Sequence, residues 1–218
     1  MKFFQQLTEK PWLVVGVEPL HDGGDSTAFA ARSGLKWFFI VASVLFMLLI
    51  ITFAGRMAYE DWRPTPESNL LWLNTFVLIL SSAAMQWAHM SAQRDRMEDV
   101  KVGLLAGGIT AFAFLAGQIL AWRQLAMLGY FEVTNPAIAF FYLITGLHAL
   151  HLLGGLIAWG RTTDKVWRRG FEIAEVRQSI ELCTLYWHFL LAVWLVLFGL
   201  LFSGNNNMAF LLALCGIR

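Results

Sequence analysis

Long apolar runs alternate with short charged segments along this chain. Five runs, at about residues 35–54, 70–90, 102–122, 137–159 and 182–202, are each about twenty residues long and contain no Asp or Glu. An α-helix rises about 1.5 Å per residue, so each run can cross a hydrocarbon layer about 30 Å thick. The pattern predicts an all-α integral membrane protein with a bundle of five transmembrane helices.

The segments that flank this membrane domain at 35–202 are more polar. Residues 1–34 carry charges, prolines and a Gly-Gly pair, and we expect a polar N-terminal arm. The arm has no early apolar core of the kind that marks a cleaved signal peptide. In residues 203–218, the apolar stretch 208–217 is too short to span a membrane, so we expect a short interfacial tail.

Basic residues are distributed unequally between the two sides of such a bundle. With five spans, one side receives twelve of the sixteen Lys and Arg residues and the other receives four. Because cytoplasmic segments are enriched in Lys and Arg, this bias predicts a cytoplasmic N-terminus and a periplasmic C-terminus.

Composition supports the assignment to the class of membrane proteins and argues against nucleic-acid binding and ion transport. The 218 residues are 58% hydrophobic and 14% charged, whereas soluble domains have about a quarter charged residues. The net charge of +1 gives no basic field for binding nucleic acid. Proton and cation transporters usually need intramembrane carboxylates, which these runs lack.

Small residues in the third run predict close helix packing. They form two series with a spacing of four: Gly103, Gly107 and Ala111, and then Ala113, Gly117 and Ala121. Small residues at this spacing let the backbones of neighbouring helices approach closely.

Four histidines lie in or at the end of the apolar runs. His148 and His151 are three positions apart, so they share one helix face, which we expect to meet protein or water rather than lipid. His188 has a depth similar to that of His151, so the two can meet if their helices are neighbours, and His89 ends the second run. A metal or haem site is one interpretation; because no carboxylate accompanies them, we favour histidines that form structural hydrogen bonds.

Other residues near the run ends have simpler interpretations. Glu181 precedes the fifth run, where a carboxylate can stabilise a helix N-terminus. An ion pair with the Arg-rich segment before it, or with a lipid-associated cation, is the other interpretation. Six tryptophans lie near run ends, and most of them are expected to anchor the protein in the membrane interface; they are Trp62, Trp72, Trp87, Trp122, Trp159 and Trp187. Trp194 lies deeper, and we expect it to pack between helices.

Three stretches form a combination that points to a family. They are Leu73-Asn74-Thr75 leading to Trp87-Ala88-His89-Met90-Ser91, then Thr145-Gly146-Leu147-His148-Ala149-Leu150-His151, and then Glu181 leading to Tyr186-Trp187-His188-Phe189. In this order, over about residues 35–202, they resemble subunit III of haem-copper respiratory oxidases in its short five-helix bacterial form.

The resemblance implies an accessory subunit in the bacterial inner membrane, without catalytic residues, metal or cofactor of its own. Haem and copper are expected in the partners, which are catalytic subunit I, subunit II and other respiratory-complex subunits. The resemblance also implies bound phospholipid in a cleft between the first pair of helices and the rest, and contact with subunit I mainly through the first helices. The candidate residues for helix interfaces or this cleft are His89, His148, His151, Glu181, Trp187 and His188.

The sequence departs from the family at three acidic positions. By alignment they fall on Ser43, Ala121 and Leu191, which argues against a direct role in proton uptake. Two alternatives stay open: an accessory protein of a nitric oxide reductase, which is a relative of subunit III, or an independent histidine-dependent membrane protein.

Overall fold

Five long α-helices make up the part of the chain that the structure describes. The computed structural model describes residues 23–57, 59, 62, 69–129, 136–168 and 173–206. The helices are α2 (Gly23–Arg56), α3 (Asn69–Gln93), α4 (Met97–Met127), α5 (Pro136–Trp167) and α6 (Ile173–Asn206). Each is long and apolar enough to span a membrane, which confirms the predicted all-α fold with five helices of this kind. Backbone contacts divide the chain into two units, Met1–Gly34 and Leu35–Arg218, and the helix bundle belongs to the second unit.

The helices extend beyond the apolar runs from which they were predicted. Helix α5 starts with Pro136, whose fixed φ and missing N–H suit the first helical position, and it continues past Trp159 into a charged segment. There Arg168 Nε pairs with Asp164 Oδ1 at 2.8 Å, one turn apart. Such pairs support a helix in water, so hydropathy alone underestimates its length.

The predicted terminal segments are only partly described. Residues 23–34 of the predicted arm are helical, and α6 continues to Asn206, four residues past the predicted fifth run. Residues 1–22 and 207–218, including the short apolar stretch at 208–217, lie outside the described residues.

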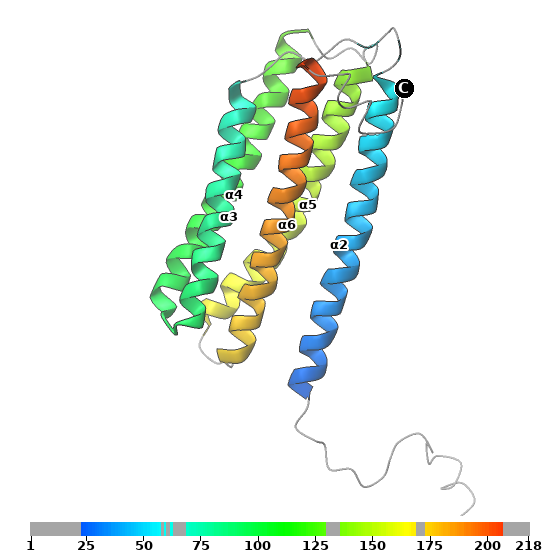
Figure 1. Ribbon diagram of the computed structural model, residues 1–218. Coiled ribbons are helices and arrows are strands. Elements are labelled where there is room, and N and C mark those ends of the chain that lie inside the picture. The colour runs from blue at the N-terminus through cyan, green and yellow to red at the C-terminus, as the bar shows by residue number, and fades with distance from the viewer. Residues whose placement is uncertain are drawn as a thin grey trace, which may run out of the picture. The chain divides into compact units, whose positions relative to one another are not determined.

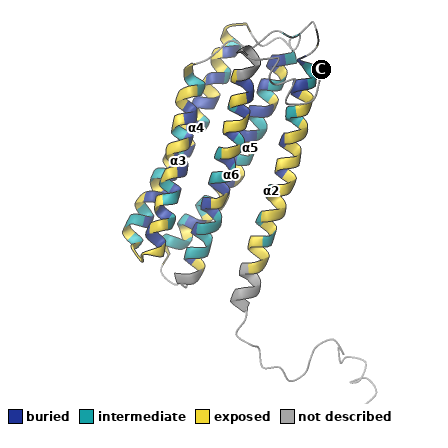
Figure 2. Cartoon of the chain, viewed as in Figure 1, coloured by how far each residue is buried: buried dark blue, intermediate teal, exposed yellow. Residues whose placement is uncertain are grey.

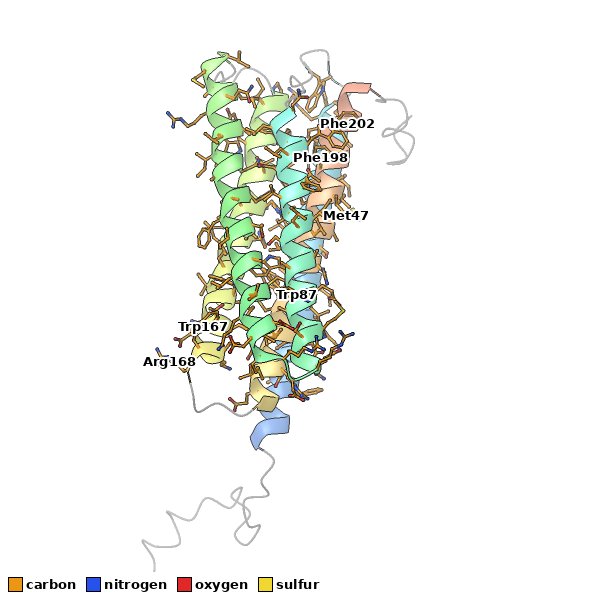
Figure 3. The ribbon with its side chains drawn as sticks, turned by 90° about the vertical axis from the view of Figure 1, so that its left-hand side faces the viewer. Met47, Trp87, Trp167, Arg168, Phe198 and Phe202 are labelled. Carbon is orange, nitrogen blue, oxygen red and sulfur yellow. The ribbon has the colours of Figure 1, made fainter. Side chains whose placement is uncertain are left out.

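Helices α3 to α6 form a four-helix bundle in which successive helices run in opposite directions (Figure 1). Close backbone contacts join α3 to α4 and α6, and α5 to α4 and α6. The turns after α3 and α5 lie at one end of this bundle, here called the α3–α4 end. The opposite end is called the α2–α3 end. In Figure 3, Phe198 and Phe202 lie near the α2–α3 end of α6, where both rings contact Trp72 of α3 edge-on.

Small residues bring α4 against α3, as predicted for the first series. A Cβ placed on Gly103 would lie 2.8 Å from the Cβ of Ala88. The second series is wrong at Ala113, which is exposed, while its neighbour Phe114 is fully buried. Each step of four residues turns about 40° around the helix axis, so repeated steps of four move out of the interface. A step of three residues, from Ala111 to Phe114, returns to it.

Helix α2 packs more loosely than the other four. Among the residues that the structure describes, no Cα atom of α2 lies within 8 Å of a Cα atom of another helix. Aromatic rings bridge the space: Phe39 stacks on Phe189 at 4.4 Å between centroids, and Phe53 meets Phe140 at 5.8 Å. In Figure 2 most of α2 is exposed.

Two apolar grooves follow from this spacing. The α2–α6 groove, of about 270 Å³, is lined by Ser43, Phe46 and apolar residues of both helices. The α2–α5 groove, of about 450 Å³, is lined by Thr52 and apolar residues that include Val44 and Leu147. Side chains therefore keep α2 at a distance without filling the space beside it.

Asp95 holds the tight turn between α3 and α4, and its substitutions are expected to differ. Its φ is +58°, a left-handed conformation that Asp, Asn and Gly tolerate and that costs other residues about 1–2 kcal/mol. Its carboxylate also pairs with Arg177 of α6, an exposed ion pair worth at most about 1 kcal/mol. Asp95→Ala should therefore lower the thermal midpoint more than Asp95→Gly, which loses only the ion pair. Equal losses would show that the backbone conformation is not strained.

Candidate functional site

A hydrogen-bonded cluster between α3 and α6 contains His188. Its Nδ1 lies 2.6 Å from Ser82 Oγ, and its Nε2 lies 2.9 Å from Gln86 Oε1. Because an amide oxygen only accepts, Nε2–H is the donor to Gln86, and in the neutral ring Nδ1 accepts from the serine hydroxyl. Both nitrogens of the ring are thus engaged across a helix interface.

His151 contacts α2 and not His188, so the expected meeting of these two histidines is wrong. Its Nδ1–H donates to the carbonyl of Leu147 in its own helix at 2.8 Å. Its ring lies against Phe46, with centroids 5.3 Å apart, and its backbone carbonyl accepts from Tyr186 Oη. Helices α5 and α6 are neighbours, but both ring nitrogens of His188 bond to Ser82 and Gln86 of α3.

His148 lies at the centre of the bundle. It is fully buried, and neither ring nitrogen has a hydrogen-bond partner in the protein. The rings of Trp194, Phe114 and Phe46 surround it at centroid distances of 5.1, 5.9 and 6.5 Å. His148 and His151 do share a face, since Phe46 contacts both rings, but His148 points deeper.

His89 lies near the α3–α4 end and bonds within its own helix. The Gln93 side-chain amide lies 3.0 Å from its Nε2, and Nδ1 is buried without a protein partner. Among the described residues, no group of three or more His, Cys, Asp or Glu side chains could hold a metal ion.

The buried tryptophans tie α6 to α3. Trp187, a candidate for a helix interface, is fully buried, so it is not one of the tryptophans that anchor in the membrane interface. Its Nε1–H donates to Ser81 Oγ at 2.9 Å, and Ser81 donates to the carbonyl of Gly107 at 2.7 Å. Trp194 is also fully buried, as predicted, and donates to Thr75 Oγ1 at 3.0 Å. Each indole therefore completes a bond across the bundle.

Glu181 does not stand at the start of a helix, which contradicts the expected role. Helix α6 begins at Ile173, more than two turns earlier, and Glu175 is the acidic residue of its first turn. The macrodipole acts within the first turn, so Glu181 is too far along α6 to stabilise that end.

The positions that lack the family's acidic residues lie in different surroundings. Ser43 lines the α2–α6 groove, Ala121 is fully buried, and Leu191 is half-buried on α6. None of these side chains can bind or release a proton.

No role in bridging the helices was predicted for several polar residues of this site. Ser81 and Ser82 bond to α4 and α6, and the side-chain amide of Asn74 donates to Gln118 Oε1 at 3.1 Å. The sequence does contain a signal for these bonds. Asn74, Ser81, Ser82 and Gln86 are hydrogen-bonding residues in a largely apolar run, and such residues turn toward protein.

Known proteins share this sequence pattern over most of the chain. Residues 21–204 match the family described as cytochrome c oxidase subunit III. Cytochrome c oxidase subunit 3 of Synechocystis sp. is 34% identical over 181 residues, 78% of this chain and 73% of that protein. The Thermostichus vulcanus protein of the same name is 26% identical over 202 residues, covering 91% and 97%. Cytochrome bo(3) ubiquinol oxidase subunit 3 of Pseudomonas aeruginosa is 26% identical over 190 residues, covering 84% and 87%.

Proposed function

The chain belongs to the cytochrome c oxidase subunit III family, and from this premise we propose that it is the accessory, cofactor-free subunit of a haem-copper terminal oxidase. It is a multi-pass membrane protein. The names of its relatives favour an oxidase over a nitric oxide reductase or an independent histidine-dependent protein. In this role the chain stabilises the catalytic subunit, while haem, copper and electron transfer belong to the partners.

The setting proposed for the complex is a bacterial inner membrane, with the N-terminus in the cytoplasm. The unequal distribution of Lys and Arg supports this orientation. Because residues at the three acidic positions cannot carry protons, the proposed contribution is structural and does not include proton uptake.

Phospholipid is proposed to occupy the two grooves beside α2. Apart from Ser43 and Thr52, their linings are apolar. Water in such a groove gains few hydrogen bonds, whereas an acyl chain loses nothing by leaving the bilayer for an apolar wall. The grooves lie between α2 and the α5–α6 pair, close to the place that the family resemblance implied.

The observation that carries the role of an assembled subunit is a polar patch at membrane depth. Gln86 and His188 are half-buried, and His188 lies about 10 Å along α6 from Glu181. Polar side chains in the hydrocarbon layer face protein or water. The surface formed by α3 and α6 around these two residues, here called the α3–α6 face, is therefore proposed to meet the catalytic subunit.

The proposal is tested by purifying the tagged chain from its own membranes in mild detergent. The eluate is expected to contain a haem-copper catalytic subunit, its haem absorption bands and bound phospholipid detected by mass spectrometry. A chain that is recovered alone, colourless and folded contradicts the accessory role. Recovery of a nitric oxide reductase contradicts the oxidase assignment but keeps the accessory role.

A pair of matched variants tests the α3–α6 face. Ala83 is exposed on α3, one turn from Gln86, and Ala113 is exposed on α4. Ala83→Trp adds bulk to the face without touching internal bonds, so it should reduce the co-purifying haem several-fold, whereas Ala113→Trp should leave it unchanged. Both variants should keep the thermal midpoint of the isolated chain. If haem were lost with Ala113→Trp and not with Ala83→Trp, the contact with the catalytic subunit would lie on α4, and the accessory role would stand.

A further inference from the structure

The centre of the bundle holds polar atoms that no protein group satisfies. Both ring nitrogens of His148 and the side-chain amide nitrogen of Gln118 are buried without a hydrogen-bond partner in the protein. His148 is fully buried and Gln118 is 1% exposed. Buried polar groups are almost always hydrogen-bonded, because an unpaired one costs about 1–3 kcal/mol.

Contacts of neighbouring residues put Gln118 and His148 at the same level of α4 and α5. Trp122 Nε1 donates to Thr145 Oγ1 at 3.1 Å, and the rings of Phe114 and His148 lie 5.9 Å apart. Gln118 lies one turn from both Trp122 and Phe114 on α4, and His148 lies one turn from Thr145 on α5. Residues three or four apart share a helix face, so Gln118 lies on the face of α4 that meets the part of α5 carrying His148.

The inventory of donors and acceptors restricts what can bind between them. Gln118 Oε1 already accepts from Asn74, so the free part of its amide is the NH₂ group, which only donates. A neutral imidazole offers one N–H donor and one acceptor nitrogen. A cation cannot bind to the NH₂ group, and an anion cannot bind to the acceptor nitrogen. The ligand must therefore both donate and accept hydrogen bonds.

The surroundings restrict its size. Aromatic rings of Phe46, Phe114 and Trp194 enclose His148, and neither polar residue reaches the surface. Water is the small molecule that both donates and accepts, and buried waters typically bond to two to four otherwise unsatisfied polar groups.

We propose that Gln118 and His148 bind at least one internal water molecule between α4 and α5. The water accepts from the Gln118 amide and donates to the acceptor nitrogen of His148. Through the bond between Asn74 and Gln118, it extends one polar chain from α3 through α4 to α5 at the middle of the membrane. This inference does not depend on the identity of the partner subunit.

The first test is a cryo-electron microscopy map of the full complex, or of the chain in lipid nanodiscs if it purifies alone, at a resolution that shows ordered waters. A density peak within hydrogen-bond distance of the Gln118 amide and a His148 ring nitrogen is expected. Direct contact between the two side chains, or no peak where other buried waters of the chain are visible, overturns the proposal.

A second test uses the ¹⁵N-histidine-labelled protein and solid-state NMR. The His148 signals, identified by their loss in His148→Phe, should receive magnetisation from water protons, and in Gln118→Leu this transfer should fall at least several-fold. His151 serves as an internal control, because its Nδ1–H is bonded to Leu147. If His148→Phe does not fold, the His148 signals are assigned by sequential backbone correlations in the doubly labelled protein, and unchanged transfer to them in Gln118→Leu would overturn the proposed bridge.

Discussion

Gly103→Ala is expected to destabilise the bundle by about 1–3 kcal/mol, the usual cost of overpacking a close-packed interface. The added Cβ would lie 2.8 Å from the Cβ of Ala88 and 3.0 Å from its Cα and N atoms. Real Cβ atoms essentially never come this close, and the obstacle is the backbone of α3, which cannot rotate away as a side chain can. Helices α3 and α4 must therefore move apart along their whole contact.

The thermal midpoint of the purified complex in detergent measures this effect. Gly160→Ala and Gly199→Ala are matched controls, since a Cβ at either position meets nothing within 4 Å. Because alanine favours the helix over glycine by up to about 1 kcal/mol, these controls should be neutral or slightly stabilising. A Gly103→Ala protein as stable as the controls would show that α3 and α4 can separate without cost.

This contrast among glycines shows what spacing can predict. The series Gly103, Gly107 and Ala111 predicted a close helix contact, and the structure confirms it because two steps of four residues stay on one face. The spacing could not say that the partner is α3, since any neighbouring helix would satisfy it. It also could not show that the contact shifts to Phe114, since that depends on the crossing of two particular helices.

The histidines show why the site was harder to predict than the fold. Five apolar runs determine five helices almost without reference to one another, because each satisfies its own backbone bonds. A histidine partner depends on the rotation of two helices and on every side chain between them. Depth alone suggested that His151 could meet His188, but the His151 ring bonds to Leu147 of its own helix and His188 bonds to Ser82.

The hydropathy pattern also could not locate helix boundaries that lie in charged segments. The fifth apolar run begins at about residue 182, but α6 begins at Ile173, because charged residues can continue a helix into water. The role expected of Glu181 failed for this reason. A helix start is better located by its first-turn acid, Glu175, than by the edge of the apolar run.

Trp187→Ala is expected to destabilise the bundle more than Gly103→Ala does. The indole is fully buried and donates to Ser81 Oγ, which in turn donates to Gly107 of α4. Removing a buried Trp side chain costs about 3–5 kcal/mol in water-soluble cores. Lipid solvates apolar groups nearly as well as protein does, so in a membrane the transfer part is weaker and the loss of packing dominates. We therefore expect a loss near the lower end of this range.

Trp187→Phe separates the contributions of packing and hydrogen bonding to that loss, and Trp87→Ala is a control for removing an indole. Trp187→Phe keeps most of the ring volume but leaves Ser81 without its donor, which should cost about 1 kcal/mol. Trp87→Ala removes an indole that is 42% exposed in the half of α3 nearer the α3–α4 end (Figure 3) and should cost less than the Trp187→Phe change in the isolated chain. Thermal midpoints in one detergent rank the three proteins. If Trp187→Phe were as damaging as Trp187→Ala, the hydrogen-bonded chain from α6 through α3 to α4, and not the packed ring, would hold this part of the bundle together.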